Sequence, residues 1–392
     1  MKIALVHDYL VQDGGAERVL QAFHDIWPDA PTFALLYDPA KMGRNFRGKD
    51  IRTTFLQRLP FALQQYKWLM PLMPIATETH DLSGFDVVLS SASAFAKGVI
   101  TRPETLHLCY CHTPTRYLWS DTHSYVNDIG LSKPIRSAVS LMLPSIRIWD
   151  RLAADRVDHF IANSETVQRR ITKYYHRESE VIHPPVDTSR FRVGRGEGGY
   201  YLAGGRLVAY KRFDIVVQAF NKLGIPLKIF GEGPEMEQLR AASKKNIEFL
   251  GRVPESEKAT LYAGAIAYIH PQEEDFGITA VEAMASGRPV IAYRKGGAVE
   301  TIEEEKTGLF LEEQTWEELA NQIIRFKPEE FNPTEIREHA LQYDVEEFKT
   351  KMREYAMNAY ARHQEPRGQS PFGTVPSFQP HYAHRDRHPT VA

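Results

Sequence analysis

Residues 270–291 read HPQEEDFGITAVEAMASGRPVI, and this stretch is the basis for predicting the fold. Apolar runs just before and at the end of this stretch, residues 265–270 and 289–293, are typical of short buried strands. Between them we expect a compact helix over residues 277–286. A helix that begins after a glycine presents unpaired N–H groups and lets a ligand come close to the backbone. The stretch therefore predicts an anion-binding turn within a strand–loop–helix–strand unit.

Two carboxylates mark this unit, Glu274 in the loop and Glu282 in the helix. Their spacing of eight residues lets them hold two parts of one extended ligand. Two glutamates alone are common as solvated acids beside a helix. Together with Phe276, Gly277 and the run ASGRPV at residues 285–290, they indicate a site.

With these neighbours, the stretch resembles the hallmark of family four of the retaining glycosyltransferases, which have the GT-B fold. That hallmark is a Glu, seven residues, a second Glu, a run of small residues and Gly-x-Pro-Val. The resemblance implies that Glu274 lies near the donor sugar and that Glu282 binds the ribose of the nucleotide. It also implies that the amides between them, at Phe276, Gly277 and Ile278, contact the sugar and the phosphates.

The composition is that of an ordinary soluble protein, with 392 residues, 43% hydrophobic and 25% charged residues. This length suits two domains, and a net charge of −2 argues against bulk nucleic-acid binding. No run of 18 apolar residues occurs and a strand is expected from residue 3, so we expect a cytoplasmic protein. The two cysteines, Cys109 and Cys111, fit neither a disulfide framework nor a zinc site, and we interpret them as packing residues.

The N-terminal half begins with an expected strand at residues 3–7, a loop that ends in Gly14 and Gly15, and a helix over residues 16–26. Such a turn lets a phosphate or sugar approach the backbone, although a glycine pair is more often simply a turn. The family resemblance implies that residues 14–18 lie under the phosphates of the donor.

Residues 41–76 combine seven basic residues and one acidic residue with many large apolar side chains. One interpretation is a surface that rests on an anionic membrane. The alternative is a pair of helices that cover the first sheet with a solvated basic edge. A similar mixture at residues 133–156 slightly favours the membrane.

Residues 85–90 and 105–111 predict buried parallel strands, and His112 follows the second of them. Loops at the carboxyl ends of such strands carry functional groups, although a single histidine is usually structural. Around His112 the sequence most resembles bacterial O-antigen and exopolysaccharide mannosyltransferases, which implies a catalytic-site role for His112. Arg116 and Trp119 are candidate acceptor contacts.

Residues 181–187 contain a proline pair that can continue neither a helix nor a central strand, and we expect the interdomain hinge there. From residue 200 on, strands and helices alternate, which predicts a second parallel, doubly wound sheet. The expected domains are an acceptor-side Rossmann-like domain at 1–183 and a nucleotide-sugar domain at 184–344. A helix at 345–362 crosses back to the first domain, and a disordered tail occupies 363–392.

Arg206 and Lys211 lie between a predicted strand and the next helix. They do not form a Walker loop, but two cations there can neutralise a diphosphate leaving group. The family resemblance identifies them as the diphosphate clamp, and weaker glycine turns place Gly231, Arg252 and Val253 near the nucleotide. Because Asp-x-Asp is absent from the sequence, we expect a metal-independent enzyme without a cofactor.

The sequence thus predicts a retaining transfer of a hexose, with mannose from GDP-mannose as the first choice. The expected acceptor is a lipid-linked saccharide of surface polysaccharide or lipopolysaccharide biosynthesis, on the cytoplasmic face of the inner membrane. A UDP-hexose donor, an epimerase of the same fold and a non-catalytic sugar-nucleotide-binding subunit are the alternatives.

Overall fold

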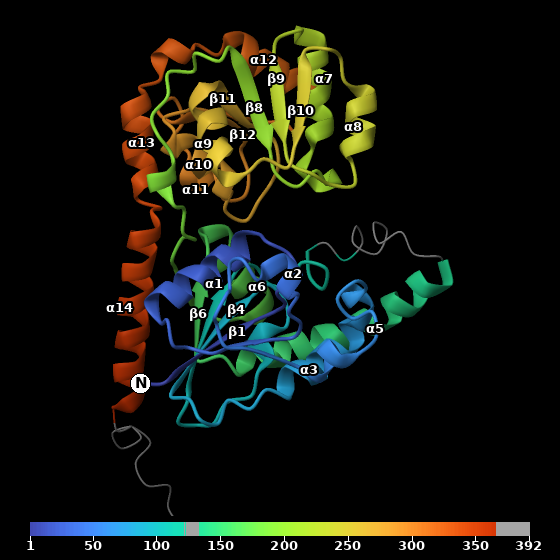
Figure 1. Ribbon diagram of the computed structural model, residues 1–392, viewed down its shortest axis with the longest axis vertical. Helices are drawn as coiled ribbons and strands as arrows, with labels where there is room; N and C mark the ends of the chain where they lie inside the picture. Colours follow the sequence, from blue (N-terminus) through green and yellow to red (C-terminus); the bar gives the residue numbers. More distant parts are fainter. Residues whose placement is uncertain (121, 123–132, 366–392) are drawn as a thin grey trace, which may run out of the picture.

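The computed structural model describes residues 1–120, 122 and 133–365, with the side chains of 133–139 also left out. It has two lobes, and each contains one parallel β-sheet with helices packed on it (Figure 1). This confirms the predicted fold, two Rossmann-like domains that face each other across a cleft.

The first lobe contains a seven-stranded sheet in the order β3-β2-β1-β4-β5-β6-β7, and all its pairings are parallel. Its strands are β1 (Ile3–His7), β2 (Thr32–Ala34), β3 (Ile51–Thr53), β4 (Val87–Ala92), β5 (Leu106–Cys111), β6 (His159–Ala162) and β7 (Ser179–Val181). The α-helices are α1 (Gly15–Ile26), α2 (Pro39–Met42), α3 (Met73–Glu78), α5 (Lys133–Asp155) and α6 (Glu165–Tyr175). The short 3₁₀ helices are η1 (Phe55–Arg58), η2 (Tyr66–Leu72), η3 (Ala96–Gly98) and η4 (Thr188–Arg190), the last of which follows the sheet.

The second lobe contains a six-stranded parallel sheet in the order β10-β9-β8-β11-β12-β13. Its strands are β8 (Tyr200–Gly204), β9 (Leu227–Phe230), β10 (Ile247–Gly251), β11 (Ala265–His270), β12 (Val290–Tyr293) and β13 (Gly308–Leu311). The α-helices are α7 (Phe213–Leu223), α8 (Met236–Ala242), α9 (Glu255–Gly264), α10 (Ile278–Ala285), α11 (Ala298–Thr301), α12 (Trp316–Arg325) and α13 (Pro333–Leu341). Two 3₁₀ turns, η5 (Ala209–Lys211) and η6 (Pro328–Glu330), complete this lobe.

The last helix, α14 (Val345–Gln364), runs along the first lobe although it follows the second lobe in sequence (Figure 1). Its Phe348 stacks on Phe23 of α1 at 5.8 Å between ring centroids, and Met352 is fully buried in the same core. The helix continues to Gln364, so the predicted boundary at residue 362 is two residues too early. The rest of the predicted tail, from residue 366 on, lies outside the described residues.

The two chain crossings between the lobes lie side by side. Val186 and Asp344 form a parallel bridge, and Asp344 also accepts a hydrogen bond from the backbone N–H of Thr188 at 3.3 Å. The predicted hinge therefore begins too early, because Val181 is the last residue of strand β7 and only the residues after it cross between the lobes. The second crossing, at Asp344, lies where the sequence analysis expected the helix at 345–362 to cross back to the first lobe.

Residues 41–76 do not form the helical pair that was one of the alternatives. They contain the end of α2, strand β3, two 3₁₀ turns and the short helix α3. Leu56, Met70 and Met73 are buried in a cluster that also includes Leu143 of α5. Other large side chains remain exposed: Phe61, Trp68 and Ile75 in this segment, and Leu141, Ile148 and Leu152 on α5. In the described ranges no helix is long and apolar enough to cross a membrane.

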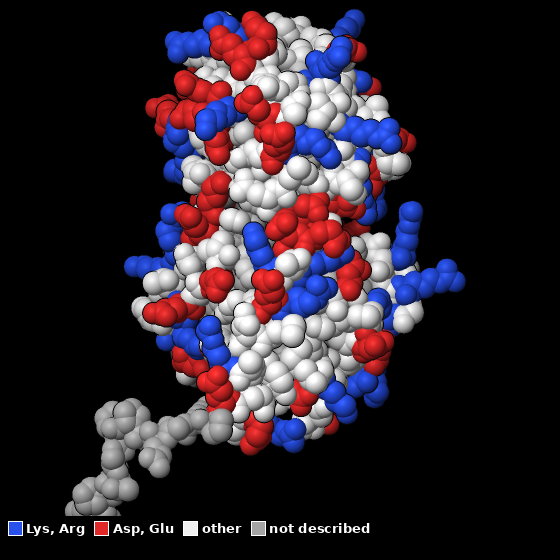
Figure 2. Space-filling model, turned by 90° about the vertical axis from the view of Figure 1, so that its left-hand side faces the viewer, with Lys and Arg blue, Asp and Glu red and all other residues white. Residues whose placement is uncertain are grey.

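The face of the molecule nearest α14 carries acidic and basic side chains that alternate over both lobes (Figure 2). Both signs occur together where the two lobes meet. The ion pairs that connect the lobes are described below.

Candidate functional site

A cleft of about 1110 Å³ separates the two lobes. The carboxyl ends of both parallel sheets supply its walls, which is where open α/β sheets bind ligands. Every catalytic or donor-binding residue predicted from the sequence lines this cleft: Gly14, Gly15, His112, Arg206, Lys211, Gly231, Arg252, Val253, Glu274, Phe276, Gly277, Ile278 and Glu282. The cleft thus brings together residues from both halves of the chain, and the role of each one stays a prediction.

Two glycines set the geometry of the loop between β11 and α10: Gly277 within the loop and Gly296 beside it. Gly277 adopts a φ of 95°, a left-handed conformation that favours glycine, and directly precedes α10. An added Cβ at Gly296 would lie 2.1 Å from the backbone oxygen of Glu274, so a side chain there would displace this loop. Within the described residues no side chain caps α10, and its first N–H groups lie beside the cleft.

Lys211 and Glu274 form an ion pair at 2.7 Å, and the whole Lys211 residue is only 8% exposed. Burial raises the pKa of Glu274, but Lys211, His270 and Arg116 together outweigh this effect and the net shift is downward. Burial likewise lowers the pKa of Lys211, while Glu274 raises it, and the net shift is upward. Both groups are therefore charged at neutral pH. Arg206 lines the same cleft with an exposed side chain.

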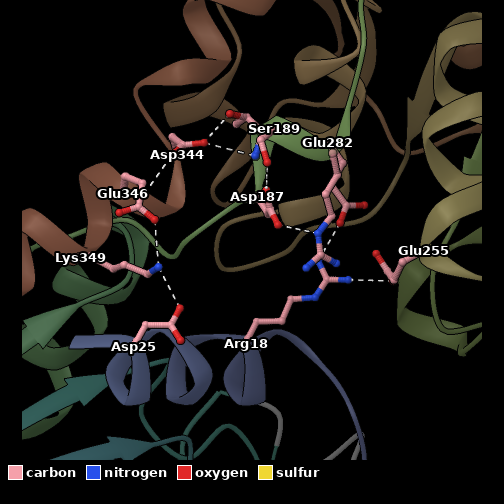
Figure 3. Close-up of polar contacts among 11 residues, drawn as sticks. Arg18, Asp25, Asp187, Ser189, Glu255, Glu282, Asp344, Glu346 and Lys349 are labelled. Atoms are coloured by element: carbon pink, nitrogen blue, oxygen red, sulfur yellow. Dashed lines mark hydrogen bonds and ion pairs between the residues drawn. The ribbon is translucent and has the colours of Figure 1, made fainter. Parts of the chain in front are cut away.

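Glu282 is 1% exposed, and its carboxylate is bound from both lobes. Arg18 of α1 donates to it at 2.7 Å, and Tyr262 of α9 donates to its other oxygen at 3.0 Å. Arg18 also pairs with Glu255 at 3.1 Å, so one guanidinium spans the cleft (Figure 3). Burial alone would lower the pKa of Arg18, but Glu282 and Glu255 raise it above its ordinary value.

The sequence analysis included Arg18 only as the last residue of the 14–18 loop and did not single it out as a site residue. Arg18 lies one helical turn after Gly14 and Gly15 and therefore on a helix end that faces the cleft. Its position after the glycine turn is the signal that could have identified it. Its partners are 237 and 264 residues away in sequence, and nothing local indicates them.

Two more polar contacts join the lobes, and sequence reasoning missed both. Arg170 of α6 is hydrogen-bonded to Asp275, the neighbour of Glu274, and also to the Thr113 hydroxyl. The carboxylate of Glu300 accepts hydrogen bonds from the backbone N–H groups of Glu165 and Thr166 at 2.7 and 2.9 Å. Glu300 thus binds the first turn of α6 across the lobe boundary, where a carboxylate is favourable.

His112 directly follows β5 and lines the cleft, as the sequence predicted. Its Nε2 atom is 2.8 Å from the Ser91 hydroxyl, and burial, together with the neighbouring His7, lowers the pKa of His112 to about 3. Arg116 also lines the cleft and lies over the ring of Tyr210 from the other lobe, 5.5 Å from its centroid.

Trp119 does not line this cleft, contrary to its suggested role as an acceptor contact. Its indole N–H donates to buried Asp150 at 2.8 Å, and Asp150 also accepts from Lys97, Thr115 and Tyr175. This network supports the 112–119 loop from beneath. In the described part of the chain, no group of three or more His, Cys, Asp or Glu side chains is arranged to hold a metal ion. Metal independence stays a prediction.

Two Rossmann-like domains with a cleft between them define a GT-B architecture, and the sequence matches two glycosyltransferase families. Residues 186–343 match the family described as glycosyl transferases group 1, and residues 14–190 match the family described as Glycosyltransferase Family 4. The two matches meet at the first crossing between the lobes. Together the two matches cover residues 14–343.

Two curated relatives resemble this chain at low identity. A GDP-mannose-dependent alpha-(1-6)-phosphatidylinositol monomannoside mannosyltransferase of Mycobacterium tuberculosis is 29% identical over 214 residues, 46% of this chain and 56% of the relative. A GDP-mannose-dependent alpha-mannosyltransferase of Corynebacterium glutamicum is 34% identical over 140 residues, 32% of this chain and 34% of the relative. The chain therefore matches about half, or less, of the length of these relatives.

Among solved structures, Anabaena HepE in complex with UDP superposes with a TM-score of 0.66. The match covers 91% of this chain and 100% of HepE at 19% sequence identity. At this identity the similarity supports the fold alone.

Proposed function

We propose that the protein is a retaining glycosyltransferase that moves a hexose from a nucleotide diphosphate sugar to a saccharide acceptor. The observation that carries this proposal is the convergence of the Lys211–Glu274 pair, Arg206 and the N-terminus of α10 on one interdomain cleft. Fixed cations and backbone dipoles stabilise the charge that develops on a departing diphosphate. The nucleotide domain would comprise residues 184–344, and the acceptor-side domain would comprise residues 1–183.

This mechanism assigns roles to four of the predicted residues. Arg206 and Lys211 neutralise the leaving diphosphate, Glu274 orients the hexose and Glu282 anchors the ribose. Cations and helix dipoles supply the charge stabilisation without a metal ion. The leaving-group oxygen takes the proton of the acceptor hydroxyl while that hydroxyl attacks from the same face. Isolation of a glycosyl adduct on an Asp or Glu side chain would contradict same-face attack.

The donor proposed first is GDP-mannose, because two relatives are GDP-mannose-dependent mannosyltransferases. A UDP-hexose is the second candidate, because the structural neighbour HepE was solved with UDP. A thermal-shift panel of GDP, UDP, ADP and dTDP tests both, since a ligand that binds the native state raises its melting temperature. The largest shift should come from GDP, and a larger shift with UDP would replace GDP-mannose by a UDP-hexose.

Transfer itself separates the proposal from its rivals. Incubation with radiolabelled GDP-mannose and a lipid-linked saccharide should give labelled lipid and free GDP. An epimerase would change the sugar without any acceptor, and a non-catalytic binding subunit would leave the donor intact even after long incubation. Slow hydrolysis of the donor without acceptor would exclude the binding subunit.

We propose that the lipid-linked acceptor is approached from an anionic membrane, with the protein attached peripherally to its cytoplasmic face. The proposal rests on the basic residues at 41–76 and on the exposed side chains of Phe61, Trp68 and Ile75. Helix α5, which packs against this segment, exposes Leu141 and Ile148 as well. These apolar groups would enter the headgroup region while the basic residues attract anionic lipid.

Co-sedimentation with vesicles tests this attachment. Binding to phosphatidylglycerol vesicles should exceed binding to phosphatidylcholine vesicles, and it should weaken in Trp68→Ser. Met357→Ser is a matched control, because Met357 is equally exposed on α14 but lies outside this segment. Equal sedimentation of the wild type and Trp68→Ser would contradict the proposed attachment.

A further inference from the structure

Four buried polar side chains connect helix α1 with the wall of the cleft. Glu17 Oε1 lies 3.7 Å from His7 Nε2, and His7 Nδ1 lies 3.1 Å from the Ser91 hydroxyl oxygen. The same oxygen lies 2.8 Å from His112 Nε2. Glu17, His7, Ser91 and His112 are each at most 9% exposed. Of these four residues, the sequence analysis gave only His112 a catalytic-site role, and the other three have no assigned role.

The hydrogens available in this chain limit how its rings can be protonated. A neutral imidazole has one N–H and one bare nitrogen, and a serine hydroxyl donates a single hydrogen. If Ser91 donates to one ring, the facing nitrogen of that ring is bare, and the other ring can donate to the Ser91 oxygen. The tautomers of His7 and His112 are therefore coupled through Ser91.

Glu17 decides the direction of this coupling. A carboxylate that faces Nε2 of His7 favours a hydrogen on that atom and leaves Nδ1 bare to accept from Ser91. Ser91 then accepts from Nε2–H of His112. We propose that Glu17, His7 and Ser91 are positioning residues that fix His112 as the Nε2–H tautomer, with a bare Nδ1.

This inference rests on the proposed function for its chemical meaning. In the part of the chain that the structure describes, only Ser91 is hydrogen-bonded to the His112 ring, and His112 lines the cleft. A bare Nδ1 accepts a hydrogen bond from a hydroxyl of the hexose or the acceptor, whereas an N–H would repel the hydrogen of that hydroxyl. The lowered pKa of His112 keeps its ring neutral, as a tautomer preference requires.

The tautomer can be measured on the intact protein without donor or acceptor. Bare and protonated ring nitrogens differ strongly in ¹⁵N chemical shift, so histidine-labelled protein gives a direct readout at pH 8. Comparison with His112→Gln assigns the His112 signals. We expect a protonated Nε2 and a bare Nδ1 in the wild type. A protonated Nδ1 would overturn the inference even if sugar transfer had been demonstrated.

Glu17→Gln tests the remote end of the chain. The amide N–H₂ of the new residue can donate to His7 Nε2, which places the His7 hydrogen on Nδ1, turns Ser91 towards His112 and moves the His112 hydrogen to Nδ1. We expect His112 Nδ1–H to become detectable. We also expect kcat to fall at least about tenfold while the donor KM is unchanged. An unaltered His112 spectrum would mean that Glu17 does not direct the tautomer.

Ser91→Ala removes the link itself and should release the tautomer preference of His112. Ser90→Ala is the matched control, because Ser90 is the adjacent, equally buried residue of β4 and is hydrogen-bonded to His107 instead. The control should keep the wild-type His112 spectrum and kcat. A protein that transferred no sugar would contradict the proposed function and leave the tautomer measurement standing, so the two failures are distinguishable.

Discussion

At the residue scale, the Lys211–Glu274 ion pair places two opposite charges in the cleft before a donor binds. Removing one partner of a buried ion pair strongly destabilises the folded protein, because the other charge stays buried without compensation. Lys211 therefore has two roles in the proposed mechanism: it keeps Glu274 ionised, and it faces the diphosphate when the donor binds. Its two effects can be separated by experiment.

Lys211→Met should raise the pKa of Glu274 above its ordinary value of 4.5, because burial raises this pKa and Lys211 is the main group that lowers it. A titration of the Glu274 side-chain carboxyl by ¹³C NMR measures this shift. In the wild type, the lowered pKa of Glu274 stabilises the folded state above about pH 4.5. This stabilisation is lost as the pH falls through the pKa of Glu274 in the folded protein. The variant should lose this contribution. If its Glu274 titrated below the wild-type pKa, the pair would be misassigned.

Lys211→Met and Arg206→Met should each lower kcat by about one to three orders of magnitude, the usual effect of losing one preorganised charge contact. Arg206 has no ion pair among the described residues, so its loss should change kcat without changing the pKa of Glu274. Steady-state kinetics with saturating donor measure the effect. Unchanged turnover in Arg206→Met would remove Arg206 from the proposed clamp.

Glu282→Gln should raise the donor KM about tenfold or more and leave kcat nearly unchanged, because ribose binding is equal in the ground state and the transition state. Glu255→Gln, which removes the other carboxylate that binds Arg18, is the comparison. It should change the donor KM less. A fall in kcat with constant KM for Glu282→Gln would mean that Glu282 acts on the reacting sugar instead.

At the scale of elements, the sequence predicted the longer helices and the buried strands of both sheets. The strands at residues 3–7 and 265–270 have the predicted bounds. The missed strands β2, β3, β7 and β13 have three or four residues, too few for a hydrophobic period to develop. Their pairing depends on neighbours that are distant in sequence, and local residues do not encode it.

The site follows the same division. Glu274, Gly277 and Glu282 were predictable because one strand–loop–helix unit contains them all. The contacts of Arg18 with Glu282, of Arg170 with Asp275 and of Glu300 with α6 were not predictable, since each joins residues more than 100 positions apart. A local motif supplies one wall of the cleft. The contacts that close the cleft form only when the two lobes pack together.

Strand β5 contains a fully buried histidine that should make the protein sensitive to acid. Burial lowers the pKa of His107 from 6.5 to about 4, so the unfolded chain takes up the proton first. Its contribution to stability is complete above pH 6.5 and is lost as the pH falls from 6.5 towards 4.

His107→Gln should therefore lose less stability than the wild type when the pH falls from 7.5 to 4.5. The difference from the wild type at pH 4.5 should be on the order of 2 kcal/mol, measured by urea unfolding at both pH values. His159→Gln is the control, because His159 is exposed on the neighbouring strand β6. If both variants lost the same stability between the two pH values, the burial of His107 would not explain acid sensitivity.

For the whole molecule, polar contacts hold the lobes together across the cleft. Arg18 binds Glu282 and Glu255, Arg170 binds Asp275, and Glu300 binds the first turn of α6. Polar contacts at a partly exposed boundary can exchange for water at modest cost, as lobe opening for donor entry requires. Arg18 is also bound to the carboxylate of Glu282, which is proposed to bind ribose. Donor binding and lobe closure should therefore be coupled.

Arg18→Met should favour the open arrangement, because one guanidinium connects α1 of the first lobe with two carboxylates of the second (Figure 3). The loss of such a contact costs about 1–3 kcal/mol, which changes the open-to-closed ratio roughly 5- to 150-fold. Small-angle scattering should report a larger radius of gyration for the variant. Lys349→Met is the matched control: Lys349 pairs with Asp25 at 2.8 Å, and this pair joins α14 to α1 within the first lobe. Equal radii for all three proteins would mean that Arg18 does not hold the lobes closed.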